Sequence, residues 1–145
     1  MKPYDLGYRF RRIHEGFRSA GNARGRKFDL TRAQMDILHY MFKKGESATQ
    51  RELEKHFDLK HSTVIGILKR MEKNGFIEIS VCESDRRQRS VKLLQKAYDV
   101  QKDCKTHRDY MENKFKKGLT KEELSTLEYL LDKVYDILKE DTENN

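Results

Sequence analysis

The sequence predicts a mainly α-helical fold with one small β-hairpin, an α+β arrangement. Apolar residues recur every three or four positions through most of the 145 residues, as they do along one face of an amphipathic helix. Between residues 76 and 94 this period changes to two, the period of a half-buried strand. Charged residues make up 38% of the chain and hydrophobic residues 36%, so an extended protein that buries its apolar faces by dimerising fits better than a compact monomer.

The first expected helix lies near the N-terminus. Its apolar residues recur at steps of four, three and four: Leu6, Phe10, Ile13 and Phe17. The segment Gly21–Asp29 contains two glycines and mostly polar residues, so we expect a loop or a frayed helix end there. The next helix should start near Thr31 and end at Gly45.

A pair of short helices joined by a tight turn is expected next. Thr49 begins the first of them, because its side chain can form a capping box with Glu52 three residues later. A turn around residues 58–60 leads into the second helix, which starts near His61 or Ser62 and ends at Asn74–Gly75. Two helices that meet in this way form a helix-turn-helix pattern.

A charged β-hairpin follows directly. Phe76–Val81 and Ser90–Leu94 alternate as strands do, and Glu83–Ser90, "ESDRRQRS", joins them. Few folds place a β-ribbon immediately after such a helix pair. Residues 31–95 are therefore predicted to form a winged helix-turn-helix, with the hairpin as its wing.

Two further helices complete the chain. One begins at Gln95 and is broken at Lys116–Leu119, and the other begins after Thr120, with acidic residues in its first turn. The apolar stripe of the last helix consists of Leu124, Leu127, Leu131, Val134 and Leu138. We expect residues 140–145 to be a frayed tail. Packing the terminal helices of two copies together would bury both stripes, so residues 1–20 and 96–140 are predicted to form the dimerisation part of a single domain, residues 1–145.

The distribution of charge favours nucleic acid as a partner. The net charge is +7, and residues 1–30 contribute eight basic and three acidic residues, whereas residues 97–145 carry nine basic and twelve acidic residues. The positive charge thus belongs to the first two thirds of the chain. Charge alone does not separate DNA binding from a role in solubility.

The candidate DNA-binding residues lie on the second helix of the pair and on the wing. They are Lys60, His61, Ser62, Thr63, Lys69, Arg70, Asp85, Arg86, Arg87 and Arg89. Residues near the start of such a helix meet base edges in the major groove, and an arginine at a β-ribbon tip suits the narrow minor groove. The alternatives are a solvated helix face and a hairpin whose charges prevent edge-to-edge pairing.

Other functions receive little support from the sequence. No glycine-rich phosphate loop, zinc-type cysteine cluster or nucleophile arrangement is found, so we expect no cofactor, no metal site and no enzyme. Cys82 and Cys104 are expected to be reduced thiols, with oxidant sensing left open. The short N-terminal segment lacks the apolar run of a signal peptide, and no stretch is long enough to span a membrane, so we expect a cytoplasmic protein.

Several stretches, in their order, resemble the multiple antibiotic resistance regulator (MarR) family of bacterial transcription factors. "LTRAQMDIL" (Leu30–Leu38) resembles the family's entry helix, and Arg51–Ile77 resembles its helix-turn-helix, with "STV" near the start of the recognition helix. "DRRQRSVKL" (Asp85–Leu93) is similar to the wing, with its D-x-R motif at Asp85 and Arg87. "LTKEELSTLEYLLDKV" resembles the dimerising C-terminal helix.

The resemblance implies a homodimer that binds pseudo-palindromic operator DNA, usually as a repressor, and that a small effector often releases. By this match Ser62, Thr63, Lys69 and Arg70 serve the major groove. Arg87 would enter the minor groove, with Asp85 orienting the wing.

The sequence also departs from the family pattern. Ile65 and Gly66 stand where the family often has Thr and Arg, which predicts a different operator. Leu94 and Ala97 replace the usual Thr and Gly after the wing, and the N-terminal helix lacks the cysteine of the family's peroxide sensors. Ile65 and Gly66 keep a second hypothesis open, in which the winged helix binds an acidic protein and does not read DNA specifically.

Overall fold

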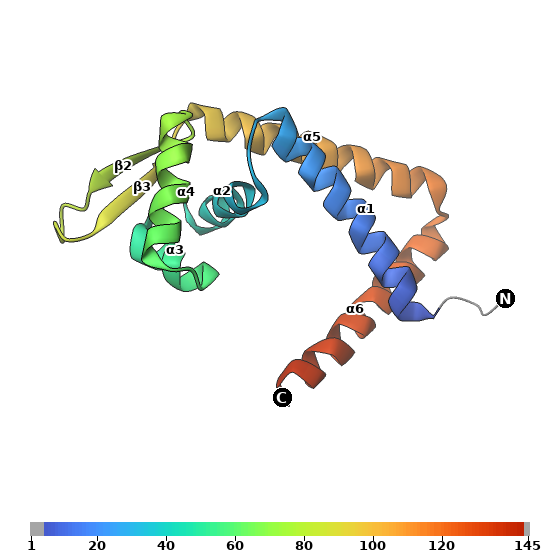
Figure 1. The fold of residues 1–145 in the computed structure, drawn as a ribbon. Helices are drawn as coiled ribbons and strands as arrows, with labels where there is room; N and C mark the ends of the chain where they lie inside the picture. Colours follow the sequence, from blue (N-terminus) through green and yellow to red (C-terminus); the bar gives the residue numbers. More distant parts are fainter. Residues whose placement is uncertain (1–4, 144–145) are drawn as a thin grey trace. The chain divides into compact units, whose positions relative to one another are not determined.

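The computed structural model describes residues 5–143, which form six helices and three strands. In chain order these are α1 (Leu6–Lys27), α2 (Arg32–Lys44), β1 (Ser47–Thr49), α3 (Gln50–Phe57), α4 (His61–Lys73), β2 (Ile77–Val81), β3 (Arg89–Leu93), α5 (Gln95–Gly118) and α6 (Lys121–Glu143) (Figure 1). The chain divides into two compact units after Cys104, so α5 begins in the first unit and ends in the second. The predicted mainly α fold with a small β-wing is confirmed.

The sheet is antiparallel, with the strand order β1-β3-β2. β2 and β3 form the wing, in which Ile79 pairs with Val91 and Val81 pairs with Arg89. β1 pairs with the other edge of β3 and places Ala48 opposite Val91. β1 was not predicted, because a three-residue strand is too short to show a period of two.

One hydrophobic core holds the helix-turn-helix, the sheet and the start of α5 together. Its most deeply buried side chains are Ile37, Leu38, Met41, Leu53, Val64, Leu68, Met71, Phe76, Ile77, Val91, Ala97 and Val100. Together with Ala48 of β1 they come from every element from α2 to the start of α5, and within the helices they recur at the spacing that predicted an inward face. α6 contributes no buried residue within the described chain.

The predicted helix boundaries between residues 31 and 75 are confirmed. Thr31 and Thr49 each accept a hydrogen bond from the N–H three residues later, in complete capping boxes. Gly45 and Gly75 end α2 and α4 with φ angles of 125° and 83°, a region that L-residues with side chains rarely adopt. Asp58 also has a left-handed conformation, φ 50°, and makes the tight turn between α3 and α4.

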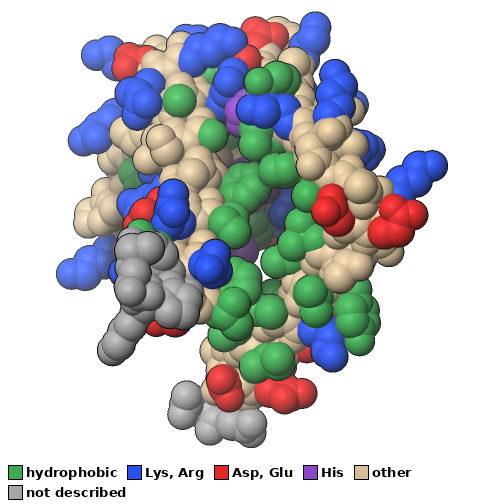
Figure 2. Space-filling view, turned by 90° about the vertical axis from the view of Figure 1, so that its right-hand side faces the viewer, with side chains coloured by type: hydrophobic (Ala, Val, Ile, Leu, Met, Phe, Trp, Pro, Cys, Tyr) green, Lys and Arg blue, Asp and Glu red, His purple; other side chains and the backbone are tan. Residues whose placement is uncertain are grey.

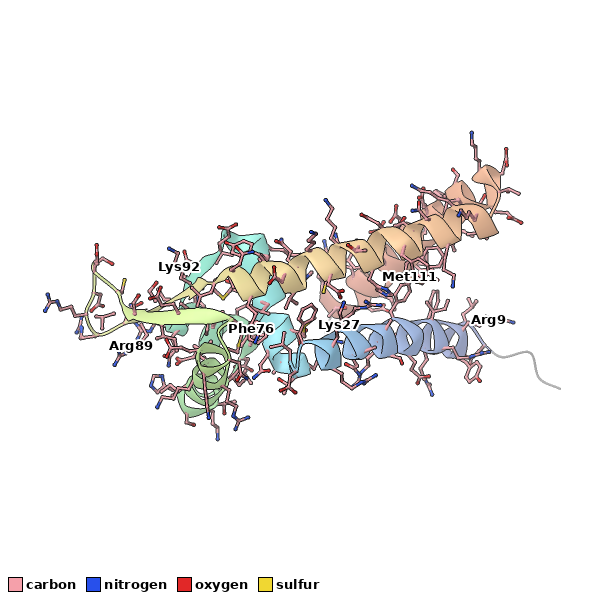
Figure 3. The ribbon with its side chains drawn as sticks, turned by 90° about the horizontal axis from the view of Figure 1, so that it is seen from above. Arg9, Lys27, Phe76, Arg89, Lys92 and Met111 are labelled. Atoms are coloured by element: carbon pink, nitrogen blue, oxygen red, sulfur yellow. The ribbon has the colours of Figure 1, made fainter. Side chains whose placement is uncertain are left out.

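Phe76 joins α4, the wing and α5. Its N–H donates to the Met71 carbonyl at 3.0 Å, and its own carbonyl accepts from the Leu94 N–H at 2.9 Å. The ring is 1% exposed and lies at the base of the wing (Figure 3). The Lys96 ammonium lies 4.6 Å from the ring centroid and donates to the Asn74 carbonyl at 2.9 Å. Lys96 therefore secures the C-terminal end of α4 as well as covering the aromatic ring.

The loop or frayed helix end expected at Gly21–Asp29 was wrong as far as Lys27, because α1 continues to that residue. Gly25 is buried in this helix, and a Cβ there would lie 2.8 Å from the Leu30 carbonyl oxygen. The glycine thus permits close packing of the chain that follows the helix and does not break it. Asp29, with φ 58°, makes the turn instead.

The expected frayed tail at residues 140–145 was also wrong as far as Glu143, where α6 ends. The Thr142 hydroxyl donates to the Leu138 carbonyl at 2.8 Å, and Lys139 lies 3.8 Å from Glu143. Residues 144–145 of that expected tail lie outside the described residues.

Large hydrophobic side chains remain exposed on α1 and α6. Leu6 is 69% exposed and Ile13 57% on α1, and Tyr135 and Leu138 on α6 are 67% and 60% exposed. The space-filling view shows hydrophobic side chains open on the surface between charged ones (Figure 2). These exposed residues belong to the stripes that the sequence assigned to dimerisation.

Asp103 of α5 is held by two basic residues at the end of α1. Its carboxylate contacts Lys27 and lies 3.4 Å from Arg24. The hydrogen bond from Lys27 is the main cause that lowers the pKa of Asp103, and burial opposes it more weakly. Because the carboxyl loses its proton more readily in the folded state, the ion pair stabilises the fold above the unfolded pKa, and this contribution is lost as the pH falls through the folded pKa.

We predict that Asp103→Asn lowers the free energy of unfolding at pH 7 by about 1 kcal/mol, the upper end for partly exposed ion pairs. The difference from wild type should shrink as the pH approaches 3. Urea unfolding at several pH values measures both effects. The exposed Asp109→Asn on the same helix is the control, and a loss for Asp103→Asn that is independent of pH would contradict the ion-pair explanation.

Candidate nucleic-acid interface

The second helix of the pair, α4, presents a polar outer face. Its inner face is buried completely through Val64, Leu68 and Met71, each at 0% exposure. At the turn, the Leu59 N–H donates to the Glu54 carbonyl at 3.0 Å, which fixes α3 against the start of α4. α4 starts after Lys60, which makes no side-chain capping bond, so the N-cap residue leaves the N–H groups of the first turn without an acceptor side chain.

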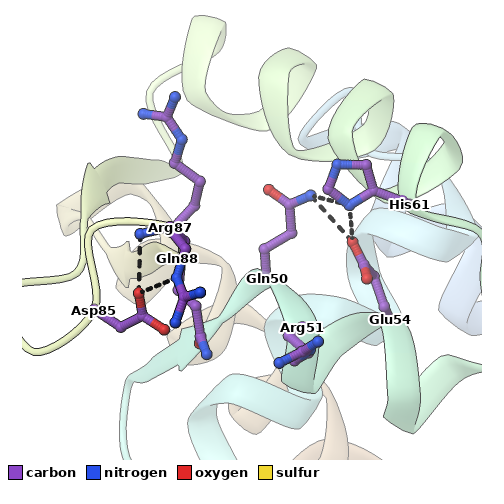
Figure 4. A pocket seen from close by; sticks show the side chains of 8 residues that line it. Gln50, Arg51, Glu54, His61, Asp85, Arg87 and Gln88 are labelled. Atoms are coloured by element: carbon purple, nitrogen blue, oxygen red, sulfur yellow. Dashed lines mark hydrogen bonds and ion pairs between the residues drawn. The ribbon is translucent and has the colours of Figure 1, made fainter.

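The tip of the wing is shaped by Asp85. The Asp85 carboxylate accepts the Arg87 N–H at 3.1 Å and the Arg87 Nε–H at 3.3 Å. The Gln88 N–H donates to the Asp85 carbonyl at 2.9 Å, and the Cys82 N–H donates to the Gln88 carbonyl at 3.0 Å. The Arg87 side chain is nevertheless 92% exposed. Asp85 therefore orients the backbone and the Nε atom of Arg87, while most of the Arg87 side chain stays exposed to solvent (Figure 4).

A cluster of three side chains links α3 to the start of α4. The Nδ1 atom of His61 lies 2.5 Å from the Glu54 carboxylate and 3.2 Å from Nε2 of Gln50. Gln50 is 8% exposed and donates to the same Glu54 oxygen at 3.1 Å. Burial raises the pKa of Glu54, but hydrogen bonds from Gln50 and His61 outweigh it and hold the pKa below its usual value. The carboxylate stays charged and holds the histidine ring in place.

A polar cavity of about 380 Å³ separates this cluster from the wing (Figure 4). The lining residues are Gln50, Arg51, Glu54, His61, Asp85, Arg87, Gln88 and Arg89. Four of them, Gln50, Arg51, Glu54 and Gln88, were not predicted from the sequence. The available signal was the spacing of Gln50 and Glu54, which lie one turn apart on a helix that ends four residues before His61.

All ten predicted site residues are accessible. Asp85 is half-buried, and the other nine are exposed. The structure brings four of them, His61, Asp85, Arg87 and Arg89, around the polar cavity. Lys69 and Arg70 lie farther along α4 and do not line it, and Arg89 lies on the wing beyond Phe76 (Figure 3). Their roles in binding stay predictions.

Both cysteines are free thiols. Cys82 lies just after β2, where hydrogen bonds with the Ser84 hydroxyl and with the backbone of Ser84 and Asp85 lower its pKa. Cys104 packs against the hydrophobic core. Oxidant sensing by either one stays an open hypothesis.

Residues 5–143 contain no cluster of three or more histidine, cysteine or acidic side chains arranged to hold a metal ion. None of the helices in this range is long and apolar enough to cross a membrane.

A helix-turn-helix followed by a β-hairpin, with a third short strand at the edge of the sheet, defines a winged helix-turn-helix protein. The family model described as MarR family matches residues 28–88. The transcription regulator MarR from Oenococcus oeni PSU-1 is 31% identical, with 91% of this chain and 99% of that chain covered and a TM-score of 0.57. The chain belongs to the MarR family.

Two other solved structures share the fold. A mutant MarR from E. coli is 25% identical, covers 93% of this chain and 99% of its own, and has a TM-score of 0.70. The S. aureus MepR–DNA complex is 23% identical, with 92% and 99% covered and a TM-score of 0.76. Both likenesses extend over nearly the whole chain.

We predict that Asp85→Ala accelerates solvent exchange of the Arg87 amide roughly fivefold, because a hydrogen bond of about 1 kcal/mol is lost. Asp85→Asn keeps an acceptor oxygen and should change the rate much less. NMR exchange measurements on both variants test this. Equal rates in wild type and Asp85→Ala would show that the carboxylate does not shape the tip.

Proposed function

We propose that the chain is a sequence-specific DNA-binding transcriptional regulator that acts in the cytoplasm as a homodimeric repressor. It binds a pseudo-palindromic operator and is released by a small effector. Residues 31–95 form the DNA-binding part, and residues 1–20 and 96–140 form the dimerisation part of a single domain, residues 1–145. MepR, which shares the fold, is described as a transcription regulator of a multidrug efflux pump and has been solved with DNA.

The proposal rests mainly on one observation: the same module presents a polar outer face on α4 and an exposed Arg87 on the wing, which Asp85 orients. The hydroxyls of Ser62 and Thr63 lie in the first turn of α4, where they suit base edges and phosphate oxygens in the major groove. Lys69 and Arg70 lie two turns later and suit the DNA backbone. Arg87 reaches for the minor groove, where a guanidinium is favoured by the negative potential.

The other candidates have narrower roles. Lys60 and His61 precede or begin α4 and favour phosphate contact. Arg86 and Arg89 on the wing favour phosphate as well, whereas Asp85 acts through Arg87.

Dimerisation is supported by the exposed stripes of α1 and α6. Leu127, Leu130 and Leu131 of α6 are between 42% and 49% exposed. Exposed apolar side chains lose the free energy of burial unless another surface covers them. A second copy of the chain offers the same apolar stripe and positions two recognition helices about 34 Å apart, one turn of DNA.

A second candidate function is a protein-interaction module that binds an acidic partner. Ile65 and Gly66 favour it, because neither supplies a hydrogen-bond donor to a base. The two functions differ in sequence preference and salt dependence. A steep fall in affinity with salt and a preference for selected over scrambled duplexes support DNA reading.

We predict that Arg87→Ala weakens binding to a duplex selected from random DNA at least tenfold at fixed salt, since the variant loses the wing contact. Arg108→Ala, which removes one exposed arginine from α5, controls for net charge and should bind nearly as wild type. Fluorescence anisotropy gives both affinities. An affinity unchanged by Arg87→Ala would remove the wing from the mechanism.

We also predict a dimer at micromolar concentration, with Leu131→Asp shifting the mass toward that of the 17.3 kDa monomer. The substitution brings like charges together in the apolar interface, while circular dichroism should still report a helical chain because Leu131 is exposed. Sedimentation velocity measures the mass. A monomeric wild type would contradict the dimer.

A further inference from the structure

Gly66 lies in the middle of the outer face of α4. The buried residues Val64 and Leu68 flank it in sequence and point inward. On a helix of 3.6 residues per turn, position 66 lies opposite this buried face. Ser62 is one turn before it and Arg70 one turn after it, and both are exposed.

Within residues 5–143, no turn and no close contact requires a glycine at this position. Gly66 has a helical backbone, unlike Gly45 and Gly75, the glycines of the described chain with positive φ. A Cβ built on Gly66 meets no atom within 4 Å, whereas one on Gly25 would lie 2.8 Å from a carbonyl oxygen. Gly66 therefore serves neither a turn nor a close internal contact.

A glycine inside a helix lowers stability relative to alanine, because glycine loses more conformational freedom when it becomes ordered. This loss of helix stability occurs at the position where the recognition face should approach DNA. Ile65, beside Gly66, adds no donor that compensates for the missing side chain. Because Gly66 lies on the outer face of the recognition helix, the absence of a side chain there benefits a partner that approaches this face.

We propose that Gly66 is a specificity-determining residue, because it lets the backbone of α4 lie directly against base-pair edges in the major groove. This inference rests on the proposed DNA-binding function. Reading of the operator is then divided between the two ends of the face. Ser62 and Thr63 act at the start of α4 and Lys69 and Arg70 act after Gly66, while the base pairs between are selected by how closely they fit the bare backbone.

The test is the series Gly66→Ala and Gly66→Leu, compared with Gly21→Ala. Alanine and leucine are strong helix formers, so both Gly66 variants should melt at a higher temperature than wild type. Affinity for the selected duplex should nevertheless fall at least fivefold for Gly66→Ala and further for Gly66→Leu. Gly21 lies in α1, outside the proposed DNA-binding and dimerisation parts, and its built Cβ would make an ordinary contact with the Arg32 side chain at 3.7 Å. Gly21→Ala therefore makes the same exchange away from α4 and should leave affinity unchanged.

The outcomes separate this inference from the proposed function. If wild type binds the selected duplex and Gly66→Ala binds it with the same affinity, the close approach at Gly66 is overturned. The proposed regulator function then still stands. A lower melting temperature for Gly66→Ala overturns the premise that the helix has room for a side chain. Absence of sequence preference in wild type overturns both proposals.

Discussion

The burial of Phe76 is the constraint on which the proposed interface depends. Through its backbone it is bonded to the last turn of α4 and to the end of β3, and its ring fills the space where the wing meets the helices. The recognition helix and the wing are thereby fixed to each other. A regulator that contacts a major groove with a helix and a minor groove with an arginine needs this fixed relation, because the two grooves are set at a constant separation along the duplex.

Features encoded by neighbouring residues were predictable. Thr49 with Glu52, Asn74 with Gly75, and the alternation before and after "ESDRRQRS" each rest on contacts within a few positions, and each boundary was confirmed. Features that depend on distant partners were not. β1 exists because Ala48 finds Val91 across the sheet, and α1 passes through Gly25 because Leu30 packs closely against it. The ten predicted site residues are accessible, but the Gln50–Glu54–His61 cluster required the turn at Asp58 to bring α3 and α4 together.

The polar groups around the cavity are largely arranged before any ligand arrives. Asp85 restrains the backbone and Nε of Arg87, and Glu54 with Gln50 restrains the His61 ring. Restraining a side chain in the free protein reduces the conformational entropy lost on binding, which increases affinity without adding a contact. In the proposed interface, the acidic residues thus act on neighbouring side chains and not on the partner.

The missing cap at Lys60 makes the two ends of α4 chemically unequal. The C-terminal end is completed within the chain by Gly75, Phe76 and Lys96. The first turn is held by the His61–Glu54 contact and by the buried side chain of Val64, but it has no capping bond from Lys60. Under the proposed function, this end of the helix therefore offers its uncapped N–H groups to a phosphate oxygen of the DNA, whereas the other end has no such role.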